Sequence, residues 1–366
     1  MTVITRQNLM AEKARLFISV GGIALSVFLI SFLMSLFQGW RFNVGRFVER
    51  VDADIWVARE GTTDFLNAAS ILPATMQAEL ASLPDIDRVD ALIVRPMKMG
   101  TVDGDATAHL VGYEVDGGAG GPLTGDTTPG PGEIIIDKVL GKKAGVGVGD
   151  AMFVSGEPLA IVSTATGGDF IFSQTAFTSI EVARELLGME TLSTFFLLQV
   201  AEGANVDVVA ARVEDSFEGT SAFTGDEFAK ATRDRIMNSI TPILIVVLLL
   251  AFIVGVAITG LTIYNATVEK AREFGILKAI GFTNAFLFRL VLEQSLVTGF
   301  LGFIIGVGAT LISSQFIADV VPEFVTLVRA QDLLLVLGST LLMTIIAALM
   351  PVRRIANVDP VAVFSA

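Results

Sequence analysis

The sequence predicts an α-helical membrane protein with four transmembrane helices and an α+β extracytoplasmic domain inserted between the first and second helices. Two observations lead to this prediction. The 366-residue chain is 52% hydrophobic and only 17% charged, and its excess of apolar residues is concentrated in four runs that are nearly free of charge. Between the first two runs lies a stretch of ordinary polar composition that is long enough to form a domain with its own core.

Each apolar run is long enough to cross a bilayer as a helix. The first, Leu16 to Phe37, has 22 residues and no charged group, which corresponds to about 33 Å of helix. Three further runs meet the same criterion: Ile240 to Tyr264, Leu296 to Phe316 with an apolar approach from Ala285, and Leu333 to Pro351. The first run could instead be a cleaved signal peptide, because basic residues precede it. Its length and the lack of a convincing cleavage site favour a membrane helix.

Lysine and arginine residues predict the orientation of the chain in the membrane. They precede the first run, recur in the Tyr264 to Ala285 connection and follow the last run, whereas the connection between the third and fourth runs has only Arg329. By the positive-inside rule, both termini and the Tyr264 to Ala285 connection are cytoplasmic. The predicted organisation is therefore a cytoplasmic N-terminus and first helix over 1–40, an outer domain over 41–238, and three further helices over 239–366.

The predicted outer domain is acidic and shows local signals of helices and strands. It carries 15 lysines and arginines against 30 aspartates and glutamates, which argues against a nucleic-acid partner. The chain has no cysteine, so packing and not disulfides must hold the domain. Helices are expected at Pro73–Leu83, Ser179–Gly188 and Val206–Phe217, and strands at Val89–Val115 (broken by a turn), Leu159–Thr164 and Ser193–Gly203. This order suggests small layered subdomains.

Two features of this domain resemble functional motifs but have simpler interpretations. The glycine-rich stretch Gly145 to Asp150 follows a helical pattern and precedes a strand, the reverse of a dinucleotide-binding fingerprint, so we interpret it as a turn. His109 is the only histidine and cannot form a metal site alone, so we interpret it as structural. The chain contains no GxxxxGK[ST], HExxH or GxSxG motif, and we expect no catalytic, metal or cofactor site.

The segment VEKAREFGILKAIGFTNAFLFR, from Val268 to Arg289, places charge and glycine between the second and third apolar runs. Phe274, Leu277 and Ile280 recur at helical spacing and need to be covered. The cover could be the lipid surface or a groove in a cytoplasmic protein that receives a short helix. Gly281 is expected to end this helix and Thr283 to cap the next.

Three stretches resemble the FtsX-like/MacB-like permeases of ABC transporters. The stretch EKAREFGILKAIGFT resembles the cytoplasmic signature of that family, and PVRRIANVDPVAVF is similar to its C-terminal ending. The stretch EIIIDKVLGKKAGVGVGDAMFV resembles part of its periplasmic core domain. The resemblance implies that the cytoplasmic segment is a coupling helix, which docks on an ATPase subunit. The matching residues are Arg272, Glu273, Gly275, Ile276, Leu277, Lys278, Ala279 and Gly281, and Phe274 stands where isoleucine is commoner.

This resemblance implies a role as well as a fold. The chain would be a permease of the bacterial inner membrane, and a separate cytoplasmic ATPase would use ATP and Mg²⁺. A second permease copy, or a close relative, would complete the complex, with a periplasmic adaptor protein as a further partner. One expected outcome is export of a hydrophobic or amphiphilic substrate. The alternative is an FtsX-type mechanotransmitter that activates an extracellular partner such as a cell-wall hydrolase, without transport.

The third apolar run contains two further features. Gly299, Gly302 and Gly306, with Gly308, give small-xxx-small spacing, which is expected to allow close helix packing within the chain or across a dimer. Glu293 follows Arg289 by four residues and could belong to a substrate or proton path. We favour the simpler interpretation, an i,i+4 ion pair near the cytoplasmic end of the helix.

Overall fold

A computed structural model describes residues 13–66, 70–101, 104–125, 127–166, 174–321 and 324–349. The chain forms two compact units. The helical unit contains Met1–Gly39, Thr241–Val320 and Val325–Ala366, and the α/β unit contains Trp40–Ile240 with Val321–Phe324. The predicted C-terminal motif PVRRIANVDPVAVF lies outside the described residues.

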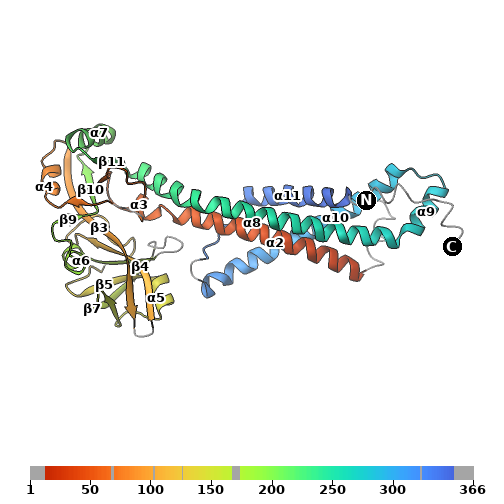
Figure 1. Ribbon diagram of the computed structural model, residues 1–366, viewed down its shortest axis with the longest axis horizontal. Helices are drawn as coiled ribbons and strands as arrows, with labels where there is room; N and C mark the ends of the chain where they lie inside the picture. The colour runs from red at the N-terminus through yellow and green to blue at the C-terminus, as the bar shows by residue number, and fades with distance from the viewer. Residues whose placement is uncertain are drawn as a thin grey trace. The chain divides into compact units, whose positions relative to one another are not determined.

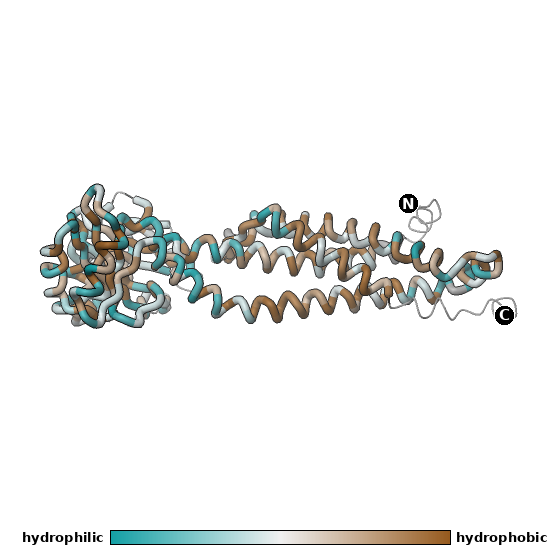
Figure 2. The backbone as a smooth tube through the Cα atoms, turned by 90° about the horizontal axis from the view of Figure 1, so that it is seen from above, coloured by the Kyte–Doolittle hydropathy of each residue, from teal (hydrophilic) through white to brown (hydrophobic). Residues whose placement is uncertain are grey.

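Among the described residues, four helices are long and apolar enough to cross a membrane, which confirms the four predicted runs as helices (Figure 1). They are α2 (Lys13–Asn43), α8 (Gly225–Glu269), α10 (Asn284–Val320) and α11 (Ala330–Leu349). Hydrophobic residues follow one another along these helices for several turns (Figure 2). Helix α8 has 45 residues and would measure about 67 Å, so it is much longer than the Ile240 to Tyr264 run predicted from hydropathy.

Small and apolar residues bring the helices of the helical unit together around α2. Ile23 and Val27 of α2 are fully buried against a cluster with members on α8, α10 and α11. Gly22 allows Ile258 of α8 to approach closely. Between α2 and α10, the Ser31 and Thr310 hydroxyls share a buried hydrogen bond of 2.5 Å. A polar contact inside and apolar side chains outside are the arrangement expected for helices surrounded by lipid.

The α/β unit contains a nine-stranded sheet with the order β11-β1-β10-β3-β4-β8-β5-β7-β6. Its strands are β1 (Ile55–Arg59), β3 (Ile86–Thr101), β4 (Gly104–Tyr113), β5 (Glu133–Asp137), β6 (Ala151–Val154), β7 (Glu157–Ala165), β8 (Gln174–Ser179), β10 (Phe195–Val200) and β11 (Thr220–Thr224); β2 (Leu72–Pro73) and β9 (Leu192–Ser193) form a separate pair. Strands β3 and β4 pair antiparallel as far as Thr101 and Gly104, so the predicted break between two strands is present, although residues 102–103 of the predicted turn lie outside the described residues. The pairs β4–β8 and β5–β7 are parallel, so the sheet is mixed.

The long strand β3 belongs to two parts of the sheet at once, which we call the two strand systems: the β11-β1-β10 part and the part formed with β4, β8, β5, β7 and β6. Its first half, from Ile86 to Leu92, pairs with β10, and its second half pairs with β4. Near its end, Met99 and Gly100 also pair with β6. The strands β3-β4-β8-β5-β7-β6 therefore close into a ring, and β3 joins this ring to the open β11-β1-β10 part of the sheet.

Short helices complete the α/β unit. They are α3 (Arg46–Arg50), α4 (Met76–Ala81), α5 (Lys138–Ala144), α6 (Ile180–Leu187) and α7 (Val206–Ser216). Side-chain caps start three of them, because Asp137, Ser179 and Asn205 accept hydrogen bonds from the backbone of α5, α6 and α7. The helix expected from Pro73 begins only at Met76, since Pro73 pairs with Leu192 in a short strand.

Candidate functional site

The segment after α8 forms a separate short helix, α9 (Ala271–Ala279). It ends where Phe282 N donates to Leu277 O at 3.0 Å, and Gly281 takes φ +105, a conformation that a side chain would disfavour. Thr283 then starts α10, because its Oγ1 accepts from Phe286 N at 3.3 Å. The predicted helix stop at Gly281 and the cap at Thr283 are both confirmed.

The apolar residues of α9 divide into a covered set and an exposed set. Phe274 is only 5% exposed and packs with Leu287, Leu290 and Val291 of α10, and Leu277 packs against the same cluster. Ile280, by contrast, is 71% exposed. Phe274 and Leu277 therefore find their cover within this chain, contrary to the expectation that all three apolar positions require an external one.

The exposed side of this segment is defined here as the α9 surface. It consists of Arg272, Glu273, Ile276, Ala279, Ile280, Gly281 and Phe282. It combines one acid and one base with three large apolar side chains. Phe282 also stacks on Phe286, with ring centroids 4.6 Å apart. A short helix that shows apolar side chains beside charges of both signs is suited to a groove in a protein partner. Of the predicted coupling residues, Phe274, Gly275 and Leu277 lie on the covered side, and Lys278 is partly buried.

Three of the four predicted packing glycines lie against neighbouring helices of the same chain, whereas a β-carbon at the fourth, Gly308, would have no heavy atom within 4 Å. A β-carbon at Gly302 would come within 2.5 Å of Ile23, and one at Gly306 within 2.7 Å of the Ala24 carbonyl, both on α2. A β-carbon at Gly299 would come within 2.6 Å of Thr344 on α11. These three positions therefore permit contacts inside the helical unit.

Glu293 forms the expected ion pair. Its Oε1 lies 3.2 Å from Nε of Arg289, one turn earlier on α10. The Arg289 side chain is 79% exposed, so the pair lies at the surface of the helical unit. The simpler of the two interpretations of Glu293 is thereby supported.

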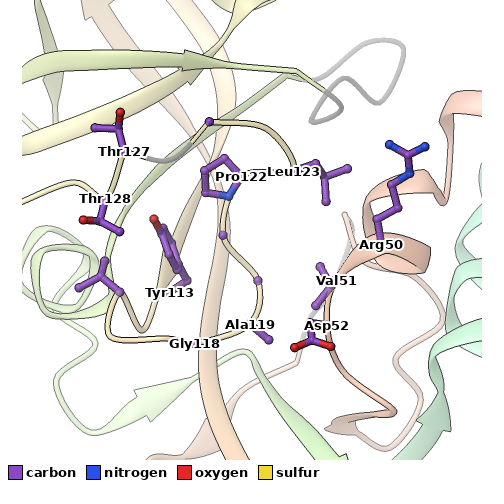
Figure 3. Close-up of a pocket in the computed structure, with 14 residues that line it drawn as sticks. Arg50, Val51, Asp52, Tyr113, Gly118, Ala119, Pro122, Leu123, Thr127 and Thr128 are labelled. Carbon is purple, nitrogen blue, oxygen red and sulfur yellow. The ribbon is translucent and has the colours of Figure 1, made fainter.

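The α/β unit contains an open pocket of about 530 Å³ (Figure 3). Residues from the end of α3, from β4 and from a glycine-rich loop line it, including Arg50, Asp52, Tyr113 and Leu123. Burial raises the pKa of Tyr113 to about 12, so its hydroxyl stays neutral at physiological pH. The wall combines a neutral hydroxyl with exposed charges and backbone groups. These groups do not form a nucleophile–base pair of the kind that hydrolases use.

The two motif-like features of the sequence are structural in this unit. His109 Nε2 donates to the Leu66 carbonyl at 3.1 Å. Burial lowers the pKa of His109, against opposing effects of Leu66 and Asp64. Among the described residues, no group of three or more potential ligands could hold a metal ion. Gly145 ends α5 with φ +69, and Asp150 accepts from Gly147 N at 2.8 Å before β6 begins. This stretch is the predicted turn between helix and strand.

Sequence reasoning did not predict how the first turns of α8 are fixed. Phe228 lies in an aromatic cluster with Trp56 and Phe195, at centroid distances of 5.2 and 5.5 Å. Phe65 N donates to Thr232 Oγ1 at 3.2 Å. Arg233 donates to the Val44 carbonyl at 3.3 Å and pairs with Glu49. The polar, helix-favouring stretch before Ile240 could have indicated that the helix begins earlier. It could not have indicated which residues the first turns of α8 contact.

Two family models match the chain. The MacB-like periplasmic core domain matches residues 16–216, and the FtsX-like permease C-terminal model matches residues 245–360. These two ranges contain, respectively, the stretch from Glu133 to Val154 and the cytoplasmic signature on which the resemblance was based. The α9 surface lies within the second range.

The chain is also similar to individual proteins. An uncharacterised ABC transporter permease of Mycobacterium tuberculosis is 23% identical over 364 residues, which is 96% of each chain. The lipoprotein-releasing system transmembrane protein LolC of Haemophilus influenzae is 32% identical over 124 residues, covering 31% of this chain and 32% of LolC. The periplasmic region of MacB from Actinobacillus actinomycetemcomitans covers 48% of this chain and 90% of its own, with 10% identity and a TM-score of 0.36. Because the MacB-like model matches more than half of the chain and the FtsX-like model matches most of the rest, this chain belongs to the FtsX-like/MacB-like family of ABC transporter permeases.

Proposed function

We propose that this chain is the transmembrane subunit of an ABC exporter and that a separate cytoplasmic ATPase docks on the α9 surface. The observation that carries the proposal is the division of α9. One side is fixed to α10 through Phe274 and Leu277, while the other leaves Ile276 and Ile280 exposed. A helix held firmly on one side can transmit a push received on the other. The partner would bind ATP and Mg²⁺, since this chain has no P-loop.

The fixed start of α8 gives a route for the movement. Helix α8 runs without a break from Gly225 to Glu269, and a single residue, Lys270, separates it from α9. At the other end, Phe228, Thr232 and Arg233 fix its first turns to the α/β unit. ATP-driven displacement of α9 would therefore move a helix whose start is embedded in the domain that we place outside the membrane. From the positive-inside rule, we expect both termini and α9 to lie in the cytoplasm, and we propose a bacterial inner membrane as the location.

A second permease copy, or a close relative, is part of the proposal. Helix α8 has only 22% of its most apolar window buried, whereas the corresponding share is 39% for α2, α10 and α11. This less covered helix is available to a second permease subunit. Lipid would cover whatever part of α8 the second copy leaves free.

Export of an amphiphilic or hydrophobic substrate is our preferred outcome, with an adaptor protein as a further partner. The local similarity to LolC, named for lipoprotein release, supports an amphiphilic cargo. Mechanical activation of an extracellular partner such as a cell-wall hydrolase, without transport, would use the same α9 contact. Export and mechanical activation differ in whether a substrate crosses or leaves the membrane. A release assay in vesicles measures this difference directly.

The docking step is tested with the full-length permease in lipid nanodiscs and its candidate ATPase. Ile280→Asp and Glu273→Lys change exposed positions of the α9 surface, and we expect both to abolish co-purification and permease-stimulated ATP hydrolysis. Leu277→Asp is a poor probe, because it would also disturb the packing against α10. Val148→Asp, at a residue that is 62% exposed in the α/β unit, is the matched control. Unchanged binding by both α9 variants would refute the docking proposal.

A further inference from the structure

The pocket at the end of β4 has one wall that is fixed by buried contacts. This wall is a glycine-rich loop that packs on the core of the α/β unit. A β-carbon at Gly120 would come within 2.5 Å of Leu92, and one at Gly121 would come within 2.7 Å of the Tyr113 ring. Such close packing holds the loop in place, so the pocket of about 530 Å³ is preformed.

The two charged residues that line the pocket differ in whether they have a partner. Asp52 pairs with Arg88, whose Nη2 lies 3.5 Å from Asp52 Oδ2. Arg88 Nε also lies 2.8 Å from Oδ2 of the buried Asp90. Arg50, by contrast, is exposed and forms no ion pair among the described residues. Arg50 is therefore the charged group of the pocket that is left to bind a ligand.

The hydroxyl of Tyr113 is a second group without a partner. Tyr113 is only 4% exposed, and its hydroxyl makes no hydrogen bond to any residue that the structure describes. A buried hydroxyl without a partner is costly unless water or a ligand supplies one. Figure 3 shows Tyr113, Thr127 and Thr128 on one side of the pocket and Arg50 on the other. A neutral hydroxyl can donate to an anion without repelling it.

Apolar side chains lie next to these polar groups. Val51, which follows α3, Val115, which follows β4, and Leu123 of the loop line the same pocket. An apolar surface beside a few hydrogen-bond donors suits a molecule with a charged head and an apolar part. The outer domain as a whole is acidic, which disfavours an anion at long range. The choice of an anionic head therefore depends on the local donors.

We propose that this pocket binds an amphiphile through its anionic head, a phosphate or a carboxylate. Arg50 donates to the head from one side, and the Tyr113 hydroxyl donates from the other. The planar guanidinium matches the oxygens of both kinds of head. The three apolar side chains contact the first carbons of the apolar part.

The place of the pocket in the α/β unit connects it with the proposed transport movement. Arg50 is the last residue of α3, and the preceding Glu49 pairs with Arg233 of α8. Arg233 also donates to the Val44 carbonyl at 3.3 Å. The head would thus bind next to the contacts that fix the start of α8. Identification of the bound amphiphile as the exported cargo rests on the proposed function, whereas the binding itself does not.

Isothermal titration calorimetry with the full-length permease in nanodiscs tests the binding, with empty nanodiscs as the background. Hexyl phosphate supplies an anionic head with a tail, inorganic phosphate the head alone, and hexyltrimethylammonium a cationic head with the same tail. We expect hexyl phosphate to bind more tightly than the other two probes. No binding of hexyl phosphate, or equal or tighter binding of either other probe, would overturn the proposal.

A fourth probe separates two sources of the same chemistry. Dihexanoyl phosphatidylglycerol carries the head of a membrane lipid on two short tails. Tighter binding of this lipid than of hexyl phosphate would support the site and indicate a phospholipid as its ligand. Weaker binding would support the site and indicate a single-chain amphiphile.

Substitutions assign the binding to this pocket. Arg50→Gln should weaken hexyl phosphate binding roughly tenfold, because a charged donor is lost. Tyr113→Phe removes only the hydroxyl and should weaken binding about fivefold. Arg59→Gln is the matched control, since Arg59 is an exposed arginine of the same unit outside the pocket, and it should bind as the wild type does. An affinity that Arg50→Gln leaves unchanged, or that Arg59→Gln lowers equally, would overturn the proposal. The titration contains no ATPase, so a failure of docking on the α9 surface would not affect its result.

Discussion

The two units of this protein place their apolar and polar side chains in opposite ways. In the α/β unit, large aromatic residues such as Trp56 and Phe195 are fully buried. In the helical unit, Ile243 and Leu249 are more than half exposed, while Thr310 and Thr344 are fully buried. The first arrangement is driven by exclusion of water, and the second relies on close packing and hydrogen bonds between helices in lipid. A single chain therefore depends on two different sources of stability.

This contrast predicts that truncation of an aromatic residue in the α/β unit has the largest effect. Phe195→Ala removes a ring that contacts Trp56, Phe65 and Phe228. We expect a loss of about 3–5 kcal/mol in the unfolding free energy of this unit. Chemical denaturation followed by tryptophan fluorescence measures it. Phe153→Ala, at a residue 38% exposed, should cost far less, and a similar cost at both sites would contradict the difference in burial.

An added side chain, and not a removed one, should be the more damaging change in the helical unit. Gly302→Val would force a side chain into Ile23 of α2, and we expect a destabilisation of about 1–3 kcal/mol. Gly308→Val is the matched control on the same helix, because no heavy atom lies within 4 Å of a β-carbon there. Thermal unfolding in detergent compares the two. An equal effect of both variants would show that α10 does not pack on α2 as described.

Removal of the buried hydrogen bond between α2 and α10 should have a smaller effect. A double-mutant cycle with Ser31→Ala and Thr310→Val isolates the 2.5 Å contact between the two hydroxyls. We expect a coupling of about 0.6 kcal/mol, the average for such bonds in membranes. A steric-trap or detergent unfolding assay provides the four stabilities. A coupling near zero would indicate that each hydroxyl is satisfied by its own helix backbone, as Ser31 Oγ with the Val27 carbonyl at 2.7 Å suggests.

The surface ion pair on α10 should contribute least. Arg289→Ala breaks the contact with Glu293 at a position that is 79% exposed. We expect a change of no more than about 0.5 kcal/mol, since solvent screens such pairs. Melting temperatures at low and high salt provide the measurement. A loss of several degrees would indicate that Glu293 has a role beyond this pair.

The sequence predicted the features that depend on local composition. Four apolar runs indicated the membrane helices, and Gly281 and Thr283 marked a helix end and a helix start because each acts on its immediate neighbours. The β3–β4 hairpin followed from alternation around a turn. Strands β1 and β8 were not predicted, because their continuously buried residues lack the alternation of a half-exposed strand.

The remaining features depend on contacts between distant residues. The covered side of α9 is defined by Leu287 and Leu290 of the next helix, which the spacing within α9 cannot reveal. Gln38 Nε2 donates to Asp332 Oδ1 although the two residues are 294 positions apart, and neither has a local signal that names the other. The closure of the sheet by β3 and β6 likewise requires two segments about 50 residues apart to meet. Only the folded chain shows these pairings.

The shared strand β3 has a consequence for how the α/β unit can be observed at work. Because one continuous strand is hydrogen-bonded into both strand systems, neither system can swing away from the other without breaking its ladder. A spin label on β1 and another on β7 should therefore report one fixed separation through every stage of nucleotide turnover. The distance between these two labels would therefore be a constant reference, with which distance changes measured elsewhere in the chain can be compared.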